Sequence, residues 1–323
     1  MMFSVIIPAY NCQEELLRRC LDCFKNSKRG FEVIVIDDGS TNETPSILSE
    51  YAQINPCIRI VTQNNHGVSF SRNRGIEEAI GDYIVFCDAD DMIDLDLLFT
   101  TVEYAEANAA DYVLSSYHKI IDNEDNIINI KHIDSQNCLK QLLCEPNLYG
   151  TVWAKVFKRD FLIRNNVRFD SNLTHGEDSI FIIDCLIKSP VIGICDNAFY
   201  SYYVNLSSAA KSNAMAVDNY IKMMRSGRDR IGLFYEDLKP YYSCFCCINL
   251  LIIMVNYIFP KGCKYRNSKA KAIEVLKQDI IAEALNSYRK ESISFKLNAV
   301  FFCLKRKLFF LFYIIVRLYN VKK

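Results

Sequence analysis

The stretch YIVFCDADD at residues 83–91 constrains the fold more than any other part of the chain. Five apolar or aromatic residues follow one another without a break and lead into three carboxylates, Asp88, Asp90 and Asp91. An unbroken apolar run of this length predicts a buried strand in a parallel sheet that is covered on both faces. Ligands of open α/β sheets bind just beyond the carboxyl ends of such strands. The carboxylates therefore mark either a binding site or an acidic turn that caps the next helix.

The segments around this strand alternate between strand-like and helix-like patterns. Short apolar runs predict strands at 3–7, 31–36 and 57–61, and apolar residues at helical spacing predict helices at 14–24, 41–51 and 67–80. The β-α-β order predicts an α/β fold with a doubly wound, mostly parallel sheet and right-handed crossovers. After about residue 212 the pattern is helical to the end. We expect a catalytic domain at 1–212 and a helical C-terminal region at 213–323.

Charge is distributed unevenly along a chain whose formal net charge is zero. Residues 261–323 contain 15 Lys or Arg and 4 Asp or Glu, a net of +11, so residues 1–260 carry −11. An acidic body with a basic end argues against general nucleic-acid binding and predicts a local anionic partner.

The fourteen cysteines lie mostly inside apolar periodic segments, which predicts reduced, buried thiols in a cytoplasmic protein. The CxxC of Cys20 and Cys23 lies in a helical pattern and has no downstream pair, so we interpret it as structural. The N-terminal residues MMFSVIIPAYN lack the basic region of a signal peptide, and no segment reaches the ~20 apolar residues of a spanning helix. The expected location is the cytoplasm, with peripheral association on the inner face of the cell membrane as an option.

Asp88 and Asp90 are two residues apart, so in an extended chain they project to the same side. Two hard oxygen donors at a strand end suit a divalent cation that also carries substrate phosphates.

Five short motifs follow one another along the chain. They are SVIIPAYN at 4–11, VIDDGST at 35–41, NNHGVSFSRNRG at 64–75, DADD at 88–91 and HGED at 175–178. Together they resemble the family-2 inverting glycosyltransferases of the GT-A, nucleotide-diphospho-sugar transferase fold. The resemblance covers roughly the first 210 residues. It implies a metal-dependent enzyme that transfers one sugar from a UDP-sugar to a glycan or lipid-linked acceptor, in the synthesis of capsule, exopolysaccharide or lipopolysaccharide.

The resemblance also assigns donor-site roles. Asp38 would accept the N3–H of uracil, since a carboxylate only accepts hydrogen bonds, while Asp37 beside it caps the turn. Tyr10 would stack on the base, with Pro8 and Ala9 giving backbone contacts, and ordinary core packing is the alternative for Tyr10. Arg72 would contact the nucleotide, and Asp88 would bind the metal or the ribose. Asp90 would coordinate Mn²⁺ or Mg²⁺. Asp91 would support these residues or cap a helix.

On the acceptor side, the resemblance makes Asp178 the general base that takes the proton of the acceptor hydroxyl. Glu177, His175 and Trp153 would contact the acceptor, although acidic residues also favour helix N-termini for structural reasons. The family often places an Arg or His after the pair Tyr202 and Tyr203, where this chain has Val204. Candidates to replace it are Ser207, Ser208 and Lys211.

Two other classes of protein compete with this interpretation. A DxD phosphohydrolase needs Thr or Val four positions after its first Asp, where this chain has Met92, and carries its motif after the first strand. A non-catalytic sugar- or lipid-binding module would not need the base Asp178. A processive membrane synthase is disfavoured because its Gln-x-x-Arg-Trp signature is absent from the sequence.

The C-terminal tail combines aromatic and basic residues. From Lys296 to Lys323 there are seven basic residues and no acidic one. The tail predicts an interfacial helix on an anionic membrane surface, and a helix that packs on the catalytic domain is the alternative.

Overall fold

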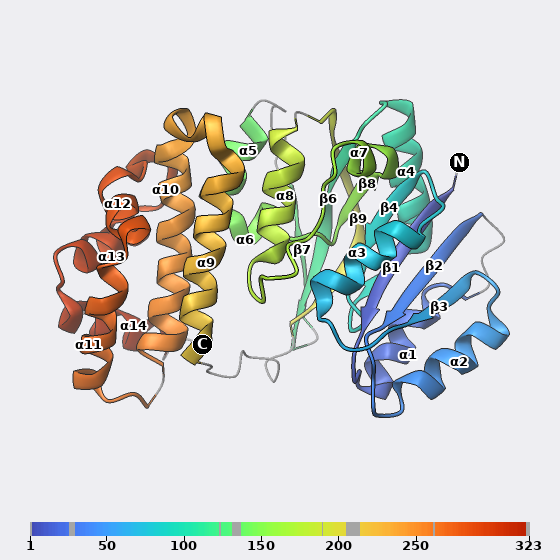
Figure 1. Ribbon diagram of the computed structural model, residues 1–323, viewed down its shortest axis with the longest axis horizontal. Coiled ribbons are helices and arrows are strands. Elements are labelled where there is room, and N and C mark those ends of the chain that lie inside the picture. Colours follow the sequence, from blue (N-terminus) through green and yellow to red (C-terminus); the bar gives the residue numbers. More distant parts are fainter. Residues whose placement is uncertain are drawn as a thin grey trace. The chain divides into compact units, whose positions relative to one another are not determined.

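The computed structural model describes residues 2–25, 30–122, 124–130, 137–188, 190–204, 214–260 and 262–320, with the side chains of 214 and 316–320 excepted. The chain divides into two compact units (Figure 1). The first comprises Met1–Gln136 and Thr151–Ala209, and the second comprises Asn137–Gly150 and Ala210–Lys323. The predicted boundary at 212 lies near this division, but residues 137–150, which the sequence placed with the catalytic domain, group with the second unit.

The first unit is built on a mixed sheet with the strand order β3-β2-β1-β4-β8-β6-β9-β5, and β7 pairs with β6. Its strands are β1 Phe3–Ala9, β2 Phe31–Asp37, β3 Ile58–Thr62, β4 Tyr83–Phe86, β5 Met92–Ile93, β6 Tyr112–Ile121, β7 Glu124–Ile128, β8 Lys155–Lys158 and β9 Ile192–Tyr203. Its helices are α1 Glu14–Asp22, α2 Thr44–Ile54, α3 Val68–Glu78, α4 Leu95–Ala107, α7 Arg159–Arg164 and α8 Glu177–Ile187.

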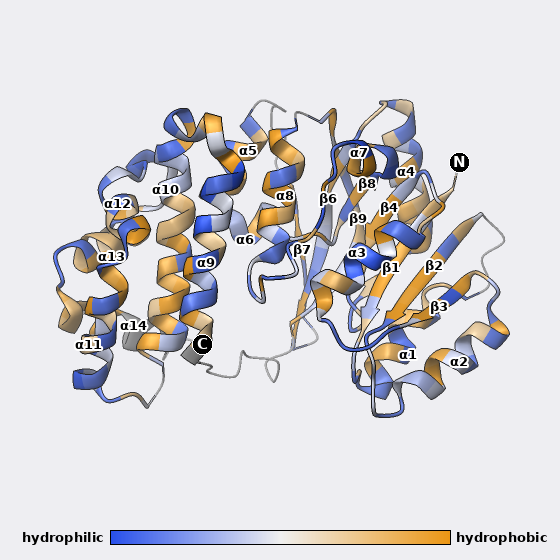
Figure 2. Cartoon of the chain, viewed as in Figure 1, coloured by the Kyte–Doolittle hydropathy of each residue, from blue (hydrophilic) through white to orange (hydrophobic). Residues whose placement is uncertain are grey.

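The strands β3, β2, β1 and β4 run parallel, as their apolar runs predict. Figure 2 shows β1 and β2 as hydrophobic along most of their length, and Val5, Ile34 and Val85 are fully buried. Beyond β4 the sheet becomes mixed: β8 is antiparallel to both its neighbours, whereas β9 is parallel to β6. The predicted class, a doubly wound and mostly parallel α/β sheet with a helical C-terminal region, is confirmed.

Helix α3 approaches the sheet closely because Gly75 has no side chain. A Cβ atom at Gly75 would lie 2.3 Å from Cγ2 of Ile6 on β1. Gly67, with φ +90°, precedes α3 in a backbone conformation that favours glycine. Gly75 thus allows close packing of α3 on β1, and Gly67 forms the turn that leads into the helix.

The crossovers leave the sheet in opposite directions on either side of β1. The chain passes from β1 to β2 and β3 on one side, and β4 then pairs with the other side of β1. Such a reversal of strand order opens a crevice outside the carboxyl ends of the strands. The fold therefore provides a binding crevice where Pro8, Asp38 and Asp88 occur.

The second unit is helical in its described part. Its elements are α5 Cys138–Cys144, α6 Pro146–Tyr149, α9 Ala214–Ile231, η3 Gly232–Phe234, α10 Tyr235–Ile252, η4 Ile253–Ile258, α11 Tyr265–Leu276, α12 Asp279–Ser287, η5 Lys290–Ser292, α13 Phe295–Lys305 and α14 Phe309–Asn320. Helix α10 packs against both α12 and α5, and Phe245, Cys247 and Leu250 on α10 are fully buried.

One helical stretch of the described residues, Met215–Ile258, is long and apolar enough to cross a membrane by length and composition, contrary to the expectation from the sequence. Within its most apolar window, 67% is buried inside the protein. Core helices of soluble proteins have the same properties.

Candidate active site

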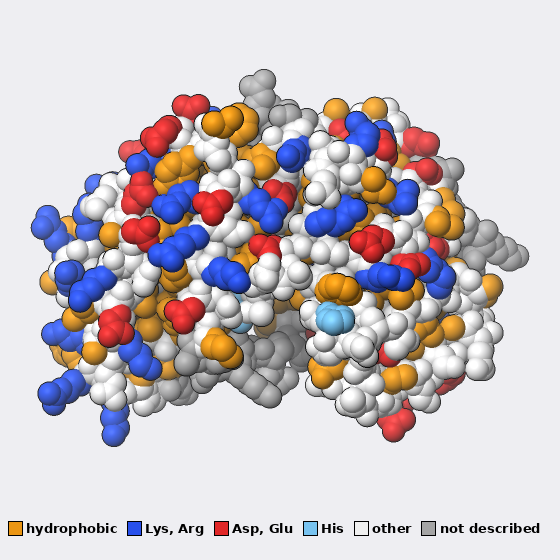
Figure 3. All heavy atoms as spheres, in the orientation of Figure 1, with side chains coloured by type: hydrophobic (Ala, Val, Ile, Leu, Met, Phe, Trp, Pro, Cys, Tyr) orange, Lys and Arg blue, Asp and Glu red, His pale blue; other side chains and the backbone are white. Residues whose placement is uncertain are grey.

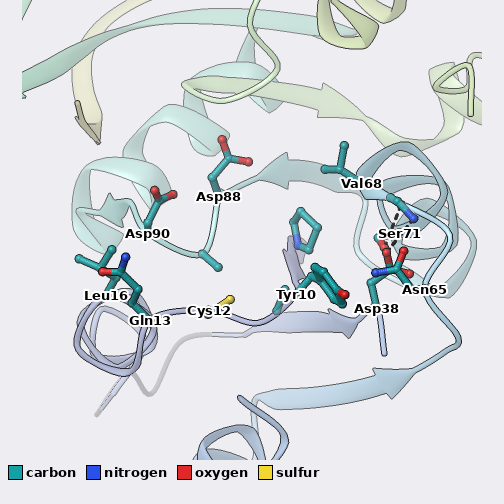
Figure 4. Close-up of a pocket in the computed structure, with 14 residues that line it drawn as sticks. Tyr10, Cys12, Gln13, Leu16, Asp38, Asn65, Val68, Ser71, Asp88 and Asp90 are labelled. Carbon is teal, nitrogen blue, oxygen red and sulfur yellow. Dashed lines mark hydrogen bonds between the residues drawn. The ribbon is translucent and has the colours of Figure 1, made fainter. Parts of the chain in front are cut away.

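A cavity of about 580 Å³ lies at the carboxyl ends of β1, β2 and β4 (Figure 4). Its lining residues come from the first unit and are Pro8, Ala9, Tyr10, Cys12, Gln13, Leu16, Asp38, Asn65, Gly67, Val68, Ser71, Asp88, Ala89 and Asp90. The structure thus brings together the predicted residues Pro8, Ala9, Tyr10, Asp38, Asp88 and Asp90. In Figure 4, Asp88 and Asp90 lie at one end of the cavity and Asp38 at the other, with Tyr10 between them.

The loop after β1 presents Tyr10 to the cavity. The Tyr10 residue is 51% exposed, which excludes core packing for its ring. The next residue, Asn11, has φ +46°; its backbone N–H donates to Oγ of Ser40, and its side-chain oxygen accepts the N–H of Thr41. These bonds tie the loop after β1 to the loop after β2 and fix the path of the chain beside Tyr10.

Asp38 is buried and organises the opposite end of the cavity. Its carboxylate accepts hydrogen bonds from Gln63 Nε2 at 2.8 Å, from the His66 N–H at 2.9 Å and from the Gly67 N–H at 2.7 Å. A carboxylate offers about four acceptor positions, so one position remains for a ligand. Asp37 accepts the N–H of Ser40 at 3.0 Å and stabilises the turn.

The three carboxylates of the DADD motif face different surroundings. Asp88 and Asp90 line the cavity, and Arg19 Nη2 donates to the backbone oxygen of Asp90 at 2.6 Å. Asp91 is only 1% exposed and accepts bonds from the Tyr200 hydroxyl at 2.6 Å and the Tyr203 N–H at 2.9 Å. Burial, with the Asp88 charge nearby, raises the pKa of Asp91 to about 8. Asp91 therefore anchors the motif to β9, and the cap of helix α4 is Asp94 instead.

Asp88 and Asp90 are the residues that could hold a divalent cation. Among the residues described, no group of three or more His, Cys, Asp or Glu side chains could hold a metal ion. Mg²⁺ in particular is commonly bound by one or two carboxylates together with substrate phosphates and waters. The donor set of Asp88 and Asp90 fits an ion of that kind, one that completes its coordination with a bound diphosphate.

Arg72, on α3, contacts three carboxylates from two distant parts of the sequence, the DADD motif and the start of α8. Its side chain is 4% exposed; Nη2 lies 2.9 Å from Asp88 Oδ1, and Nη1 lies 2.6 Å from Asp178 Oδ1 and 3.3 Å from Glu177 Oε1. Burial opposes the positive charge, but the carboxylates outweigh it and raise the pKa of Arg72. The guanidinium lies between these carboxylates, and Arg72 is not among the residues that line the cavity.

Asp178 lies in the first turn of α8, which begins after Gly176 with φ +71°. Its side chain is 21% exposed. Burial raises the pKa of Asp178 to about 7, while the adjacent Arg72 charge acts in the opposite direction. Asp178 is therefore more than an acidic residue at a helix N-terminus. Its carboxylate forms an ion pair with Arg72, which in turn pairs with Asp88 at the cavity.

The other residues predicted at the acceptor differ in accessibility. His175 is partly exposed and its Nδ1 lies 3.1 Å from Thr174 Oγ1. Trp153 is 7% exposed and stacks with Tyr200 and Tyr202, at ring-centroid distances of 5.2 and 4.9 Å. Its ring is thus occupied by aromatic neighbours and offers little surface to a sugar, contrary to the predicted stacking role.

Sequence reasoning missed Arg19 and Tyr200. Arg19 also places its guanidinium 3.6 Å from the ring centroid of Tyr203, and Tyr200 accepts the Asp88 N–H through its hydroxyl at 3.2 Å. Both contacts join segments that are far apart in the chain, so no local motif signals them. The candidates Ser207, Ser208 and Lys211 lie outside the described residues.

The chain is similar to several known glycosyltransferases. The 26% identical cholesterol galactosyltransferase of Borreliella burgdorferi is matched over 84% of this chain and 82% of its own length. The poly(ribitol-phosphate) beta-N-acetylglucosaminyltransferase TarP of Staphylococcus aureus is 24% identical over 74% of this chain and 72% of the relative. The crystal structure of S. aureus TarS 1–349 in complex with UDP-GlcNAc matches the fold with a TM-score of 0.70 at 18% identity, over 100% of this chain and 93% of that one.

The family model for glycosyl transferase family 2 matches residues 4–170, about half of the chain. That range contains the motifs from Pro8 to Asp90 that line the cavity. The chain belongs to glycosyl transferase family 2.

Proposed function

We propose that this protein transfers a single sugar, with inversion, from a UDP-sugar to a glycan or lipid-linked acceptor in the synthesis of a surface polysaccharide. The observation that carries the proposal is the Arg72 bridge, which connects Asp88 at the donor cavity to Asp178 on α8. A sugar transferase needs a charged donor site and a base close to it, and this bridge connects the two. Relatives named for the glycosylation of poly(ribitol-phosphate) and the UDP-GlcNAc complex of TarS support the acceptor and donor classes.

In this proposal the uracil base stacks on Tyr10 and donates its N3–H to the remaining acceptor position of Asp38. Pro8 and Ala9 contact the nucleotide through their backbone. Cytosine has no N3–H, so the carboxylate disfavours it. The three bonds that Asp38 already accepts hold its carboxylate in place before the donor arrives.

Asp88 and Asp90 would hold Mn²⁺ or Mg²⁺. A divalent ion in this position supplies Lewis-acid stabilisation of the leaving diphosphate, where negative charge develops. Arg19 fixes the backbone at Asp90, and the Tyr200 and Tyr203 bonds to Asp91 fix the rest of the motif.

Asp178 would remove the proton from the acceptor hydroxyl while its oxygen attacks the anomeric carbon. The new C–O bond forms on the face opposite the leaving diphosphate, which inverts the configuration. A base with a pKa near 7 is suited to proton transfer at neutral pH. Arg72 would orient Asp178, and Glu177 and His175 would contact the acceptor hydroxyls.

The proposed location is the cytoplasm. All fourteen cysteines are free thiols in this structure, and burial raises the pKa of several of them, Cys185 and Cys246 included. Buried, protonated thiols are inert and persist in a reducing compartment.

The experiment is a donor screen with the purified protein. UDP-, GDP- and dTDP-sugars are supplied with Mn²⁺ or Mg²⁺, and slow hydrolysis of the donor is measured. We expect release of UDP from one UDP-sugar and loss of that activity in EDTA. The activity should also be lost in Asp90→Asn, since a charged ligand is removed from a divalent site.

Glu103→Gln, at an exposed residue of α4, is the matched control and keeps full activity. Full activity in EDTA would contradict the metal role, and selective turnover of GDP-sugars would contradict the role of Asp38.

A further inference from the structure

Helices α13 and α14 of the second unit expose an unusual set of large apolar side chains. We call it the tail surface and define it by Phe295, Phe302, Leu308, Phe310, Leu311 and Ile314. Phe295 is 87% exposed, Phe310 64% and Phe302 52%. Surface helices of soluble proteins normally carry polar side chains on such faces. A group of exposed aromatic and aliphatic side chains points to an interaction site.

The opposite faces of the same helices are packed. Phe301, Leu304 and Phe312 are fully buried, and Phe312 lies with its ring centroid 5.5 Å from that of Phe259. The tail surface is therefore the outer side of helices that are anchored in the second unit. The contact between Phe312 and Phe259 lies within the second unit, whereas the alternative drawn from the sequence was a helix that packs on the catalytic domain.

Basic side chains accompany the tail surface. Lys296, Lys305, Arg306 and Lys307 are exposed, and no Asp or Glu occurs from 292 to 323. The Phe310 ring lies 5.9 Å from the ring of Tyr265 at the start of α11, the helix that carries exposed Arg266 and Lys269. Figure 3 shows Lys and Arg side chains gathered over this end of the second unit. On α13 and α14 the apolar side chains lie among bases with no acidic residue between them. This combination matches the chemistry of an anionic lipid surface, which offers phosphates above an apolar layer.

Other occupants fit less well. A second copy of the chain would bring like charges together across a symmetric interface. A spanning helix is excluded for these elements, because Phe295–Lys305 has 11 residues and Phe309–Asn320 has 12, whereas a span needs about 20. Lys305 ends α13, and Arg306 and Lys307 lie in the short connection to α14. The two helices thus form a bent segment that could lie in the plane of a membrane.

We propose that the tail surface docks on an anionic lipid bilayer, with its aromatic side chains at the headgroup boundary and its bases on lipid phosphates. The inference concerns a partner of the second unit and stands independently of the donor and acceptor named above. If those are right, docking delivers the enzyme to lipid-linked acceptors.

The test is co-sedimentation of the full chain with vesicles of phosphatidylcholine alone and of phosphatidylcholine with phosphatidylglycerol. We expect strong binding to the anionic vesicles only, weakened by salt. The triple substitution Lys305→Gln, Arg306→Gln and Lys307→Gln should weaken binding on the order of 10²-fold, since each base near an anionic leaflet contributes about fivefold. The matched control changes three exposed bases elsewhere, Arg164, Lys188 and Lys222, to Gln and should bind as the unmodified chain does.

A second variant, Phe302→Ser with Phe310→Ser, tests the apolar part. Both residues are exposed, so the melting temperature should not change while anionic-vesicle binding falls at least tenfold. Truncation before α13 is unsuitable because it would remove the buried Phe301 and Phe312.

Three outcomes would overturn the proposal. They are equal binding to neutral and anionic vesicles, no loss of binding in the triple variant, and binding to a single-stranded oligonucleotide in place of vesicles. Release of UDP from the donor in solution should be the same in all variants, which separates this test from the test of the transferase activity.

Discussion

Arg72 is the most constrained charged residue of the site. Its buried guanidinium neutralises carboxylates that would otherwise repel each other. Breaking a buried ion pair from one side costs about 3–5 kcal/mol, because the remaining charges are left uncompensated. A planar guanidinium can bond two carboxylates in different directions with fixed geometry, whereas a lysine ammonium is a single flexible point charge.

We therefore expect Arg72→Lys to lower kcat about 10–100-fold, with a smaller change in the KM of the donor, because Asp178 loses its orientation. The control is Arg74→Lys on the same helix, because Arg74 is exposed and its pair with Glu78 contributes little. Steady-state kinetics with one UDP-sugar distinguish the two. A change confined to donor KM would place Arg72 at the nucleotide instead.

Asp178 should control the pH dependence of the reaction. Burial raises its pKa to about 7, and a general base works only when ionised. The rate should therefore fall as pH drops through about 7 and level off above it. Asp178→Asn should lower kcat roughly 10²–10⁴-fold while donor affinity, measured by calorimetry with UDP, stays within about twofold. Loss of UDP binding with kcat retained would assign Asp178 to the donor site.

At the scale of elements, the fit of α3 against β1 determines where Arg72 lies. Gly75 → Ala places a methyl group 2.3 Å from Ile6, so the helix or the strand must shift. Overpacking of this kind typically costs about 1–3 kcal/mol. Urea unfolding should show a loss of that size for Gly75→Ala and almost none for Gly30→Ala, where a Cβ meets no atom within 4 Å. Equal stability of both variants would mean that α3 adjusts freely.

The predictable part of the fold is its parallel half. Strands β1, β2 and β4 are mostly apolar because both of their faces are buried. Each of these strands is followed by motif residues, among them Tyr10, Asp38 and Asp88. Strands β8 and β9 were not predicted: β8, Lys155–Lys158, is short and charged at both ends, and β9 contains Gly193, Asp196 and Asn197. Both strands are stabilised by pairing with β6, a long-range contact that local propensity does not contain.

The cavity could be predicted because its residues follow strand ends in sequence. The contacts that the side chains make around the cavity could not be predicted. Arg72 and Asp178 are 106 positions apart, and the covering of Trp153 by Tyr200 and Tyr202 depends on the unpredicted β9.

At the scale of the molecule, residues 137–150 make the division into units discontinuous. Helix α5 packs on α10, and Leu142, Leu143 and Tyr149 are fully buried in the second unit. A chain that ends at residue 209 would keep these side chains and lose the helices that cover them.

We expect such a truncated chain to bind a hydrophobic dye and to aggregate. Replacing 137–150 with a Gly/Ser linker in the same truncated chain should restore solubility. If the simple truncation behaves as a soluble monomer, 137–150 does not depend on the helical unit.

The position of α5 in the sequence also bears on synthesis of the chain. Leu143 leaves the ribosome about a hundred residues before Leu250 of α10. At 5–20 residues per second, roughly 5–20 s pass in which the apolar side of α5 has been made and its partner has not. The nascent first unit must therefore complete its strands with an uncovered hydrophobic segment between β7 and β8. That interval is when a holdase chaperone would have most to bind, and when slowed translation would favour misfolding.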